Sequence, residues 1–198
     1  MAADRITAEL LDKVLRSTLA ALFADLERCN WYVREHEVVN RFVFVHLIPA
    51  FQSNNLDLAL LGIESPVMQM RQHPKSKLGA RKDVVIWREA GDTFLKGCDL
   101  SDGLDESLRE QACKPLAVME WKNISRITPR PADVTKAHGD DIEWLRANLQ
   151  GKKFDVGYAI LVDQRSAPHL TCRRMTVDAE TDFLILPMTA AAASGASQ

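Results

Sequence analysis

The order of helical and strand-like segments most limits what this chain can fold into. The predicted helices cover residues 10–26, 31–48 and 133–149, and the predicted strands cover residues 84–87, 116–119, 154–162 and 169–175. Helices placed before and between strands in this way are typical of one sheet with helices packed on its faces. We therefore expect an α/β (α+β) fold with a central mixed β-sheet flanked by helices, and with an extra N-terminal helix.

The length of 198 residues suits one domain with an appended element. Residues 1–30 hold an amphipathic helix, with Thr7 as the expected N-cap and a wide apolar stripe from Leu10 to Leu26. That stripe can pack on the core or form a dimer face, and the sequence leaves both open. Residues 31–188 form the main domain, and residues 189–198 are expected to be a disordered tail because they are low in complexity.

The second helix carries one acid where an apolar residue is expected. Val38, Val39, Phe42 and Val45 are placed on its buried face, and Pro49 is expected to end it. Glu35 precedes the two valines by three and four residues, so it points to the same side. A carboxylate there is costly unless it has a partner, although a frayed first turn in solvent is the alternative.

Composition and charge exclude several classes of protein. The chain has 25 Lys and Arg against 27 Asp and Glu, a net charge of −2, which excludes a histone-like polycation. Its four cysteines form no CxxC pair, so free thiols in a reducing compartment are expected. The longest apolar stretch, residues 42–51, is too short to span a bilayer, and no signal peptide is evident. These features predict a cytoplasmic protein with no membrane partner.

Three charged residues stand at the ends of two apolar strands. Asp83 begins residues 84–87, whereas Glu120 and Lys122 follow residues 116–119 and project to one side, because alternate residues of a strand share a face. If the two strands pair, two carboxylates and one ammonium meet at one point. Carboxylates of this kind hold Mg²⁺, and the ion with a lysine can support phosphodiester hydrolysis.

The segments ARKDVVIW and PLAVMEWKN resemble the PD-(D/E)XK nuclease superfamily, which has a restriction-endonuclease-like fold. The resemblance covers roughly residues 31–175. It implies that Asp83 and Glu120 are metal ligands, with the carbonyl of Trp121 completing the coordination of Mg²⁺, for which Mn²⁺ can substitute. It implies that Lys122 is the catalytic lysine and that Glu35 is a catalytic acid near this metal or at a second one.

Two departures from this resemblance are visible. Lys82 stands where the family name has proline, and 37 residues separate Asp83 from Glu120. The separation requires an insertion over residues 89–115, which we expect to be a long loop or hairpin with a short helix at 105–113.

Local clusters of cations favour a nucleic-acid partner. The residues predicted to contact it are Arg71, Lys75, Lys77, Arg81, Lys82, Arg126 and Arg130. Cations near a metal site would neutralise phosphates, although ordinary solvated loops are the alternative.

The leading hypothesis is therefore a Mg²⁺-dependent endonuclease that acts on DNA. One alternative keeps the fold as a catalytically inactive nucleic-acid-binding or regulatory module. Another is a homodimeric interaction protein in which the N-terminal helix forms the interface.

Overall fold

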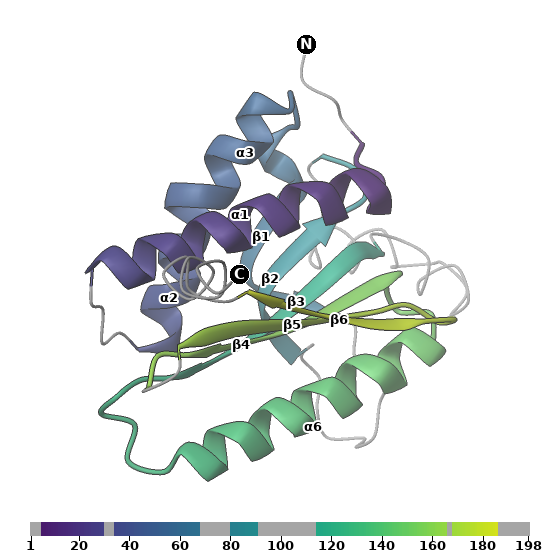
Figure 1. The fold of residues 1–198 in the computed structure, drawn as a ribbon. Helices are drawn as coiled ribbons and strands as arrows, with labels where there is room; N and C mark the ends of the chain where they lie inside the picture. Colours follow the sequence, from purple (N-terminus) through teal and green to yellow (C-terminus); the bar gives the residue numbers. More distant parts are fainter. Residues whose placement is uncertain (1–4, 30–33, 68–79, 91–113, 166–167, 186–198) are drawn as a thin grey trace, which may run out of the picture.

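The computed structural model describes residues 5–29, 34–67, 80–90, 114–165 and 168–185, and it has an α+β fold with a mixed sheet (Figure 1). The helical elements are α1 (Ala8–Cys29), α2 (Glu35–Arg41), the π-helix η1 (Phe42–Leu47), α3 (Ile48–Ser53), the 3₁₀-helix η2 (Leu58–Leu60) and α6 (Pro131–Gln150). The strands are β1 (Leu61–Val67), β2 (Ala80–Trp87), β3 (Pro115–Ile124), β4 (Val156–Asp163), β5 (His169–Met175) and β6 (Glu180–Ile185).

The six strands lie in the sheet in the order in which they occur along the chain. Strands β3 and β4 are parallel and are joined through α6, whereas every other neighbouring pair is antiparallel. Val84 of β2 pairs with Met119 of β3, so the start of β2 lies beside the C-terminal half of β3. This register brings Asp83 of β2 close to Glu120 and Lys122 of β3.

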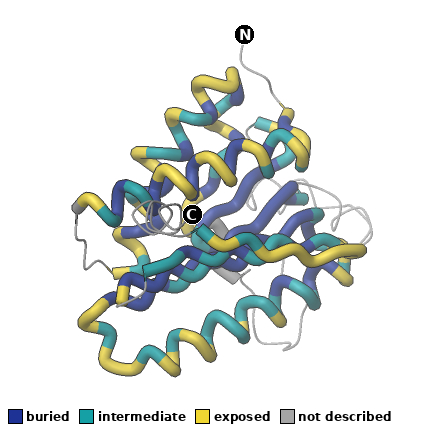
Figure 2. The backbone as a smooth tube through the Cα atoms, viewed as in Figure 1, coloured by how far each residue is buried: buried dark blue, intermediate teal, exposed yellow. Residues whose placement is uncertain are grey.

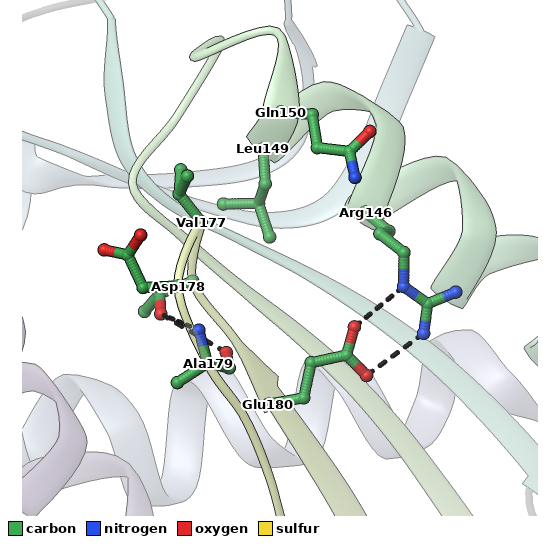
Figure 3. Close-up of a pocket in the computed structure, with 8 residues that line it drawn as sticks. Arg146, Leu149, Gln150, Val177, Asp178, Ala179 and Glu180 are labelled. Carbon is green, nitrogen blue, oxygen red and sulfur yellow. Dashed lines mark hydrogen bonds and ion pairs between the residues drawn. The ribbon is translucent and has the colours of Figure 1, made fainter.

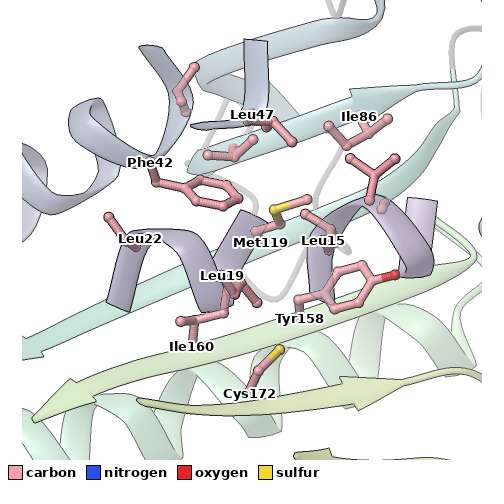
Figure 4. Close-up of a cluster of buried hydrophobic side chains, with 14 of the residues drawn as sticks. Leu15, Leu19, Leu22, Phe42, Leu47, Ile86, Met119, Tyr158, Ile160 and Cys172 are labelled. Atoms are coloured by element: carbon pink, nitrogen blue, oxygen red, sulfur yellow. The ribbon is translucent and has the colours of Figure 1, made fainter. Parts of the chain in front are cut away.

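The sheet is covered on both faces. Helices α1, α2, η1 and α3 pack on one face, and α6 packs on the other (Figure 1). The middle of the sheet is almost entirely buried (Figure 2). Leu15 and Leu19 of α1 pack with Met119 and Ile160 of the sheet in the larger core (Figure 4). Leu145 and Leu149 of α6 belong to the smaller core on the opposite face.

The N-terminal helix begins as the sequence predicts. The Thr7 hydroxyl accepts a hydrogen bond from the Leu10 backbone N–H at 3.3 Å, which is the contact expected of an N-cap. The apolar stripe, including Leu11, Leu19 and Leu26, is buried within the single chain. Core packing of α1 is thus the alternative that its burial supports.

The second helix departs from its prediction. It runs on from α2 through η1 into α3, and Pro49 lies in the first turn of α3, where a helix does not need its N–H. Val38, Val39 and Phe42 are buried as expected, but Val45 is 42% exposed. The prediction for Val45 is wrong because a π-helix has more residues per turn than an α-helix, so the 3.6-residue period fails within η1.

The strands differ from their predictions mainly in length and number. Asp83 lies inside β2, and Glu120 and Lys122 lie inside β3, rather than at the strand ends. The edge strands β1 and β6 were not predicted; β1 contains Gly62 and Pro66, and the residues of β6 are mostly exposed. Helix α6 and strand β5 match their predicted ranges closely. The helix expected at 105–113 lies outside the described residues, as does the 189–198 tail.

Candidate active site

Strands β2 and β3 bring the predicted acidic residues together. The carboxylate of Asp83 accepts a hydrogen bond from the Trp121 backbone N–H, with 2.8 Å between Oδ2 and N. Glu120 is the neighbour of Trp121 in β3, and the charge of Asp83 acts on it to raise its pKa. The two predicted metal ligands therefore lie near each other on paired strands.

Glu120 has a buried cationic partner that the sequence analysis did not identify. Its carboxylate forms an ion pair with the Lys82 ammonium, and both side chains are less than 10% exposed. The Lys82 ammonium also lies over the ring of Trp144 from α6, with Nζ 3.4 Å from the ring centroid. Lys82, predicted as a nucleic-acid-binding surface residue, is instead buried in the site, so that part of the prediction is wrong.

Lys122 lies between acids from helices on opposite faces of the sheet. Its Nζ is 2.9 Å from Oδ2 of Asp141 in α6 and 3.6 Å from Oε1 of Glu35 in α2. It also donates a hydrogen bond to the Trp121 carbonyl at 2.8 Å. The carbonyl accepts a hydrogen bond, and the two carboxylates supply opposite charge. Lys122 is therefore held in place by both helices and by its own strand.

From the sequence, Glu35 either has a partner on the buried face of its helix or lies in solvent in a frayed first turn. Glu35 is the first residue of α2, its side chain is 40% exposed, and it contacts Lys122. The acid thus has a partner in the site, although it also reaches solvent.

Burial shifts the charge equilibria of this cluster. It raises the pKa of Glu120 to about 7 despite the opposing effect of Lys82. It also raises the pKa values of Glu35 and Asp83, against the effects of Lys122 on Glu35 and of the Trp121 N–H on Asp83. For Lys122, burial lowers the pKa, but Asp141, Glu35 and Asp83 outweigh this effect and raise it overall. Removing these carboxylates from water disfavours their charged forms, as the physics of burial requires.

The donor set of the cluster suits a divalent cation. Four carboxylates (Glu35, Asp83, Glu120 and Asp141) face two ammonium groups, which leaves two negative charges in excess when all are ionised. Oxygen donors are the ligands that Mg²⁺ prefers. No three metal-binding side chains among the described residues are arranged to hold an ion together. One or two carboxylates with water and substrate oxygens are a common Mg²⁺ arrangement, so the residues present fit such an ion.

The structure describes the side chains of two of the other residues predicted to bind nucleic acid. Arg126 and Arg130 follow β3 and are exposed, and Arg130 is 3.8 Å from Asp133. Arg71, Lys75 and Lys77 lie outside the described residues, and the side chain of Arg81 is not described. The structure therefore places two of the predicted nucleic-acid-binding side chains on the surface near the end of β3.

Asp141 and Trp144 were missed by the sequence analysis. Asp141 precedes the buried Leu145 of α6 by four residues, so it shares the face of α6 that packs on the sheet. Asp141, like Glu35, is an acid on the apolar face of a helix, and this pattern is the sequence signal that identifies it. No comparable signal distinguishes Trp144 from an ordinary core residue.

A hollow elsewhere on the surface is separate from this cluster. It lies between the C-terminal end of α6 and the β5–β6 turn, has a volume of about 240 Å³ and is lined by Arg146, Val177 and Glu180 among others (Figure 3). Arg146 is paired with Glu180 there, with 2.7 Å between Nε and Oε1. The hollow contains none of the residues of the candidate site.

Comparison of the chain with protein-family models, with curated proteins and with solved structures found no significant match. Within the described ranges, no helix has both the length and the apolar character needed to cross a membrane.

Proposed function

We propose that this protein is a metal-dependent nuclease that hydrolyses phosphodiester bonds, with DNA as its substrate. The observation that carries the proposal is the grouping of Asp83, Glu120 and Lys122 on paired strands, with Glu35 beside the lysine. A restriction-endonuclease-like fold is part of the proposal. It is supported by the succession of β3, α6 and a parallel β4, which follows the order that the sequence resemblance implies.

In this proposal, Asp83, Glu120 and the Trp121 carbonyl would hold Mg²⁺ or Mn²⁺. A bound ion would polarise the phosphate and lower the pKa of a water molecule. Lys122 would direct its ammonium at the attacking water or at the charge that develops on the phosphate. Glu35 and Asp141 would keep that ammonium in place, because both contact it from helices anchored on the sheet.

The charges in and around the site bear on the class of substrate. The excess of carboxylates in the site repels a polyanion unless a cation and outlying basic residues offset it. Arg126 and Arg130 are exposed just beyond β3 and supply positive charge there. These charges support a nucleic-acid substrate, and DNA is proposed because of the sequence resemblance to restriction-endonuclease-like nucleases.

Cleavage of plasmid DNA, single-stranded DNA and RNA, with Mg²⁺ or Mn²⁺ against EDTA, tests the proposal. Asp83→Asn and Lys122→Met should each abolish metal-dependent cleavage. Asp178→Asn and Lys13→Met are the matched controls, because they make the same substitutions at exposed positions.

Each other outcome has a definite meaning. A folded wild-type protein that binds nucleic acid without cutting it would favour the inactive binding module. Cleavage that survives both site substitutions would show that the active site lies elsewhere.

A further inference from the structure

Lys82 is a buried lysine with two partners of different kinds. It is 8% exposed, and its ammonium contacts the Glu120 carboxylate and the face of the Trp144 ring. A buried charge is costly without compensation. The carboxylate supplies an opposite charge, and the ring supplies a cation–π contact that does not depend on the carboxylate.

The Lys82 ammonium lies beside a carboxylate that is proposed to bind a metal ion. Glu120 is a proposed metal ligand, and Lys82 holds its carboxylate where a metal ion would need to bind. Lys122 does not take this place, because it is bound by Asp141, Glu35 and the Trp121 carbonyl. The two lysines of the site thus have separate partners: Lys122 lies between the helices, and Lys82 neutralises Glu120.

We propose that Lys82 is an internal cation that occupies the Glu120 carboxylate in the ion-free protein, competes with the divalent ion for it, and remains over the Trp144 ring once the ion binds. This inference rests on the proposed function and adds a residue that sets the affinity for the ion. The competition is electrostatic, because a positive charge beside the carboxylate opposes the approach of a second one. Trp144 lowers the cost of the exchange, because the ammonium keeps its contact with the ring.

Direct measurement of Mn²⁺ binding to the full chain, by calorimetric titration and by electron paramagnetic resonance of free Mn²⁺, tests this role without any cleavage assay. Lys82→Met retains a long apolar side chain and removes the charge, and it should tighten Mn²⁺ binding by about tenfold or more. Lys82→Gln also removes the charge but retains a hydrogen-bond donor, so it serves if the methionine variant does not fold. Lys13→Met, at an exposed position of α1, should leave binding unchanged.

The outcomes separate this inference from the proposed function. Wild-type binding that neither Lys82 variant tightens would overturn the role of Lys82 alone. If the wild type and both folded Lys82 variants fail to bind Mn²⁺, the metal-dependent function and the role of Lys82 are both overturned. Binding that is tighter in a Lys82 variant and unchanged in Lys13→Met supports the role of Lys82.

Discussion

At the scale of the residue, the site is governed by the burial of charge. Glu120 and Lys82 compensate each other inside the sheet, and Lys122 is compensated by Asp141 and Glu35. Such pairs are weak evidence for stability, because desolvation opposes the Coulomb attraction. In the proposed function, these residues supply the charges that the reaction needs.

The raised pKa of Glu120 predicts a particular dependence of stability on pH. The pKa is about 7 in the folded chain against an ordinary value of 4.5, so the folded state binds the proton more tightly. The free energy of unfolding should therefore fall as the pH rises from about 4.5 through 7. In Glu120→Gln this contribution is absent, and the fall between pH 5 and 8 should be smaller by about 1–3 kcal/mol.

Urea unfolding in EDTA at several pH values measures this difference. Glu143→Gln, at an exposed position of α6, is the control and should retain the wild-type pH dependence. Parallel pH profiles for wild type and Glu120→Gln would contradict the assignment of the raised pKa to Glu120.

Asp141 is expected to position Lys122 in the proposed reaction. Asp141→Asn removes the charged partner 2.9 Å from Nζ and should lower kcat about 10–100-fold with little change in KM. Asp141→Glu should recover part of the loss, because the carboxylate is restored. The adjacent exposed Asp140→Asn is the control, and steady-state cleavage kinetics are the measurement. An equal loss of kcat in Asp141→Asn and Asp140→Asn would show that the substitutions act on the helix in general and not on Lys122.

At the scale of the element, the contact between α6 and β4 depends on a residue without a side chain. A Cβ on Gly157 would lie 3.3 Å from Leu145 Cδ2 and 3.4 Å from Leu145 Cβ. The contact with Leu145 Cδ2 is tighter than most Cβ contacts, so a side chain at position 157 requires Leu145 or α6 to shift by a few tenths of an ångström. Asp141 and Trp144, which contact the two lysines of the site, lie on the same helix.

Larger residues at position 157 should therefore destabilise the fold. Gly157→Val is expected to lower the free energy of unfolding by about 1–3 kcal/mol through overpacking. Gly139 lies in α6 with open space around its Cβ position, so Gly139→Ala should instead raise it by about 0.5–1 kcal/mol. Thermal and urea unfolding measure the stability of both variants. A Gly157→Val protein as stable as the wild type would show that α6 can move away from the sheet.

At the scale of the whole molecule, the helices before the sheet and α6 after β3 enclose it from both faces. Asp12 of α1 connects this helix to the sheet. It accepts hydrogen bonds from the Tyr158 hydroxyl at 2.5 Å and from Arg174 Nε at 2.7 Å. The helix before the main domain is thus tied to β4 and β5. It is part of the same core and not a separate appendage.

Truncation of the α1 stripe should show that it belongs to this core. Leu19 is fully buried, and Leu19→Ala should lower the free energy of unfolding by about 2–5 kcal/mol. Leu184→Ala makes the same change at an exposed position of β6 and should alter it by less than about 0.5 kcal/mol. Unfolding is measured at two protein concentrations. A midpoint that depends on concentration in the wild type and loses this dependence in Leu19→Ala would favour the dimer-face alternative.

Local spacing in the sequence predicts the elements with strong periodicity and the placement of Glu120 and Lys122 on one strand. The stripe of α1, the range of β5 and the sharing of one strand by Glu120 and Lys122 all follow from local spacing, because side-chain direction repeats with a fixed period within an element. Period-based reasoning failed at Val45, where η1 changes the number of residues per turn. It also missed the edge strands, whose exposed residues carry little apolar pattern.

Which charged residues contact one another depends on how the elements pack. Val84 belongs to the core on the α1 side of the sheet. Lys82 precedes it by two residues, so strand alternation assigns Lys82 to the same side. The Lys82 ammonium instead lies over the ring of Trp144 in α6, on the other side. Asp141 reaches Lys122 from the opposite side of the sheet to Glu35, and the two acids are more than a hundred residues apart. Contacts of this kind depend on strand register, helix packing distance and the reach of long side chains. None of these is encoded within one element, so the partners of Lys82 and Lys122 are properties of the assembled fold.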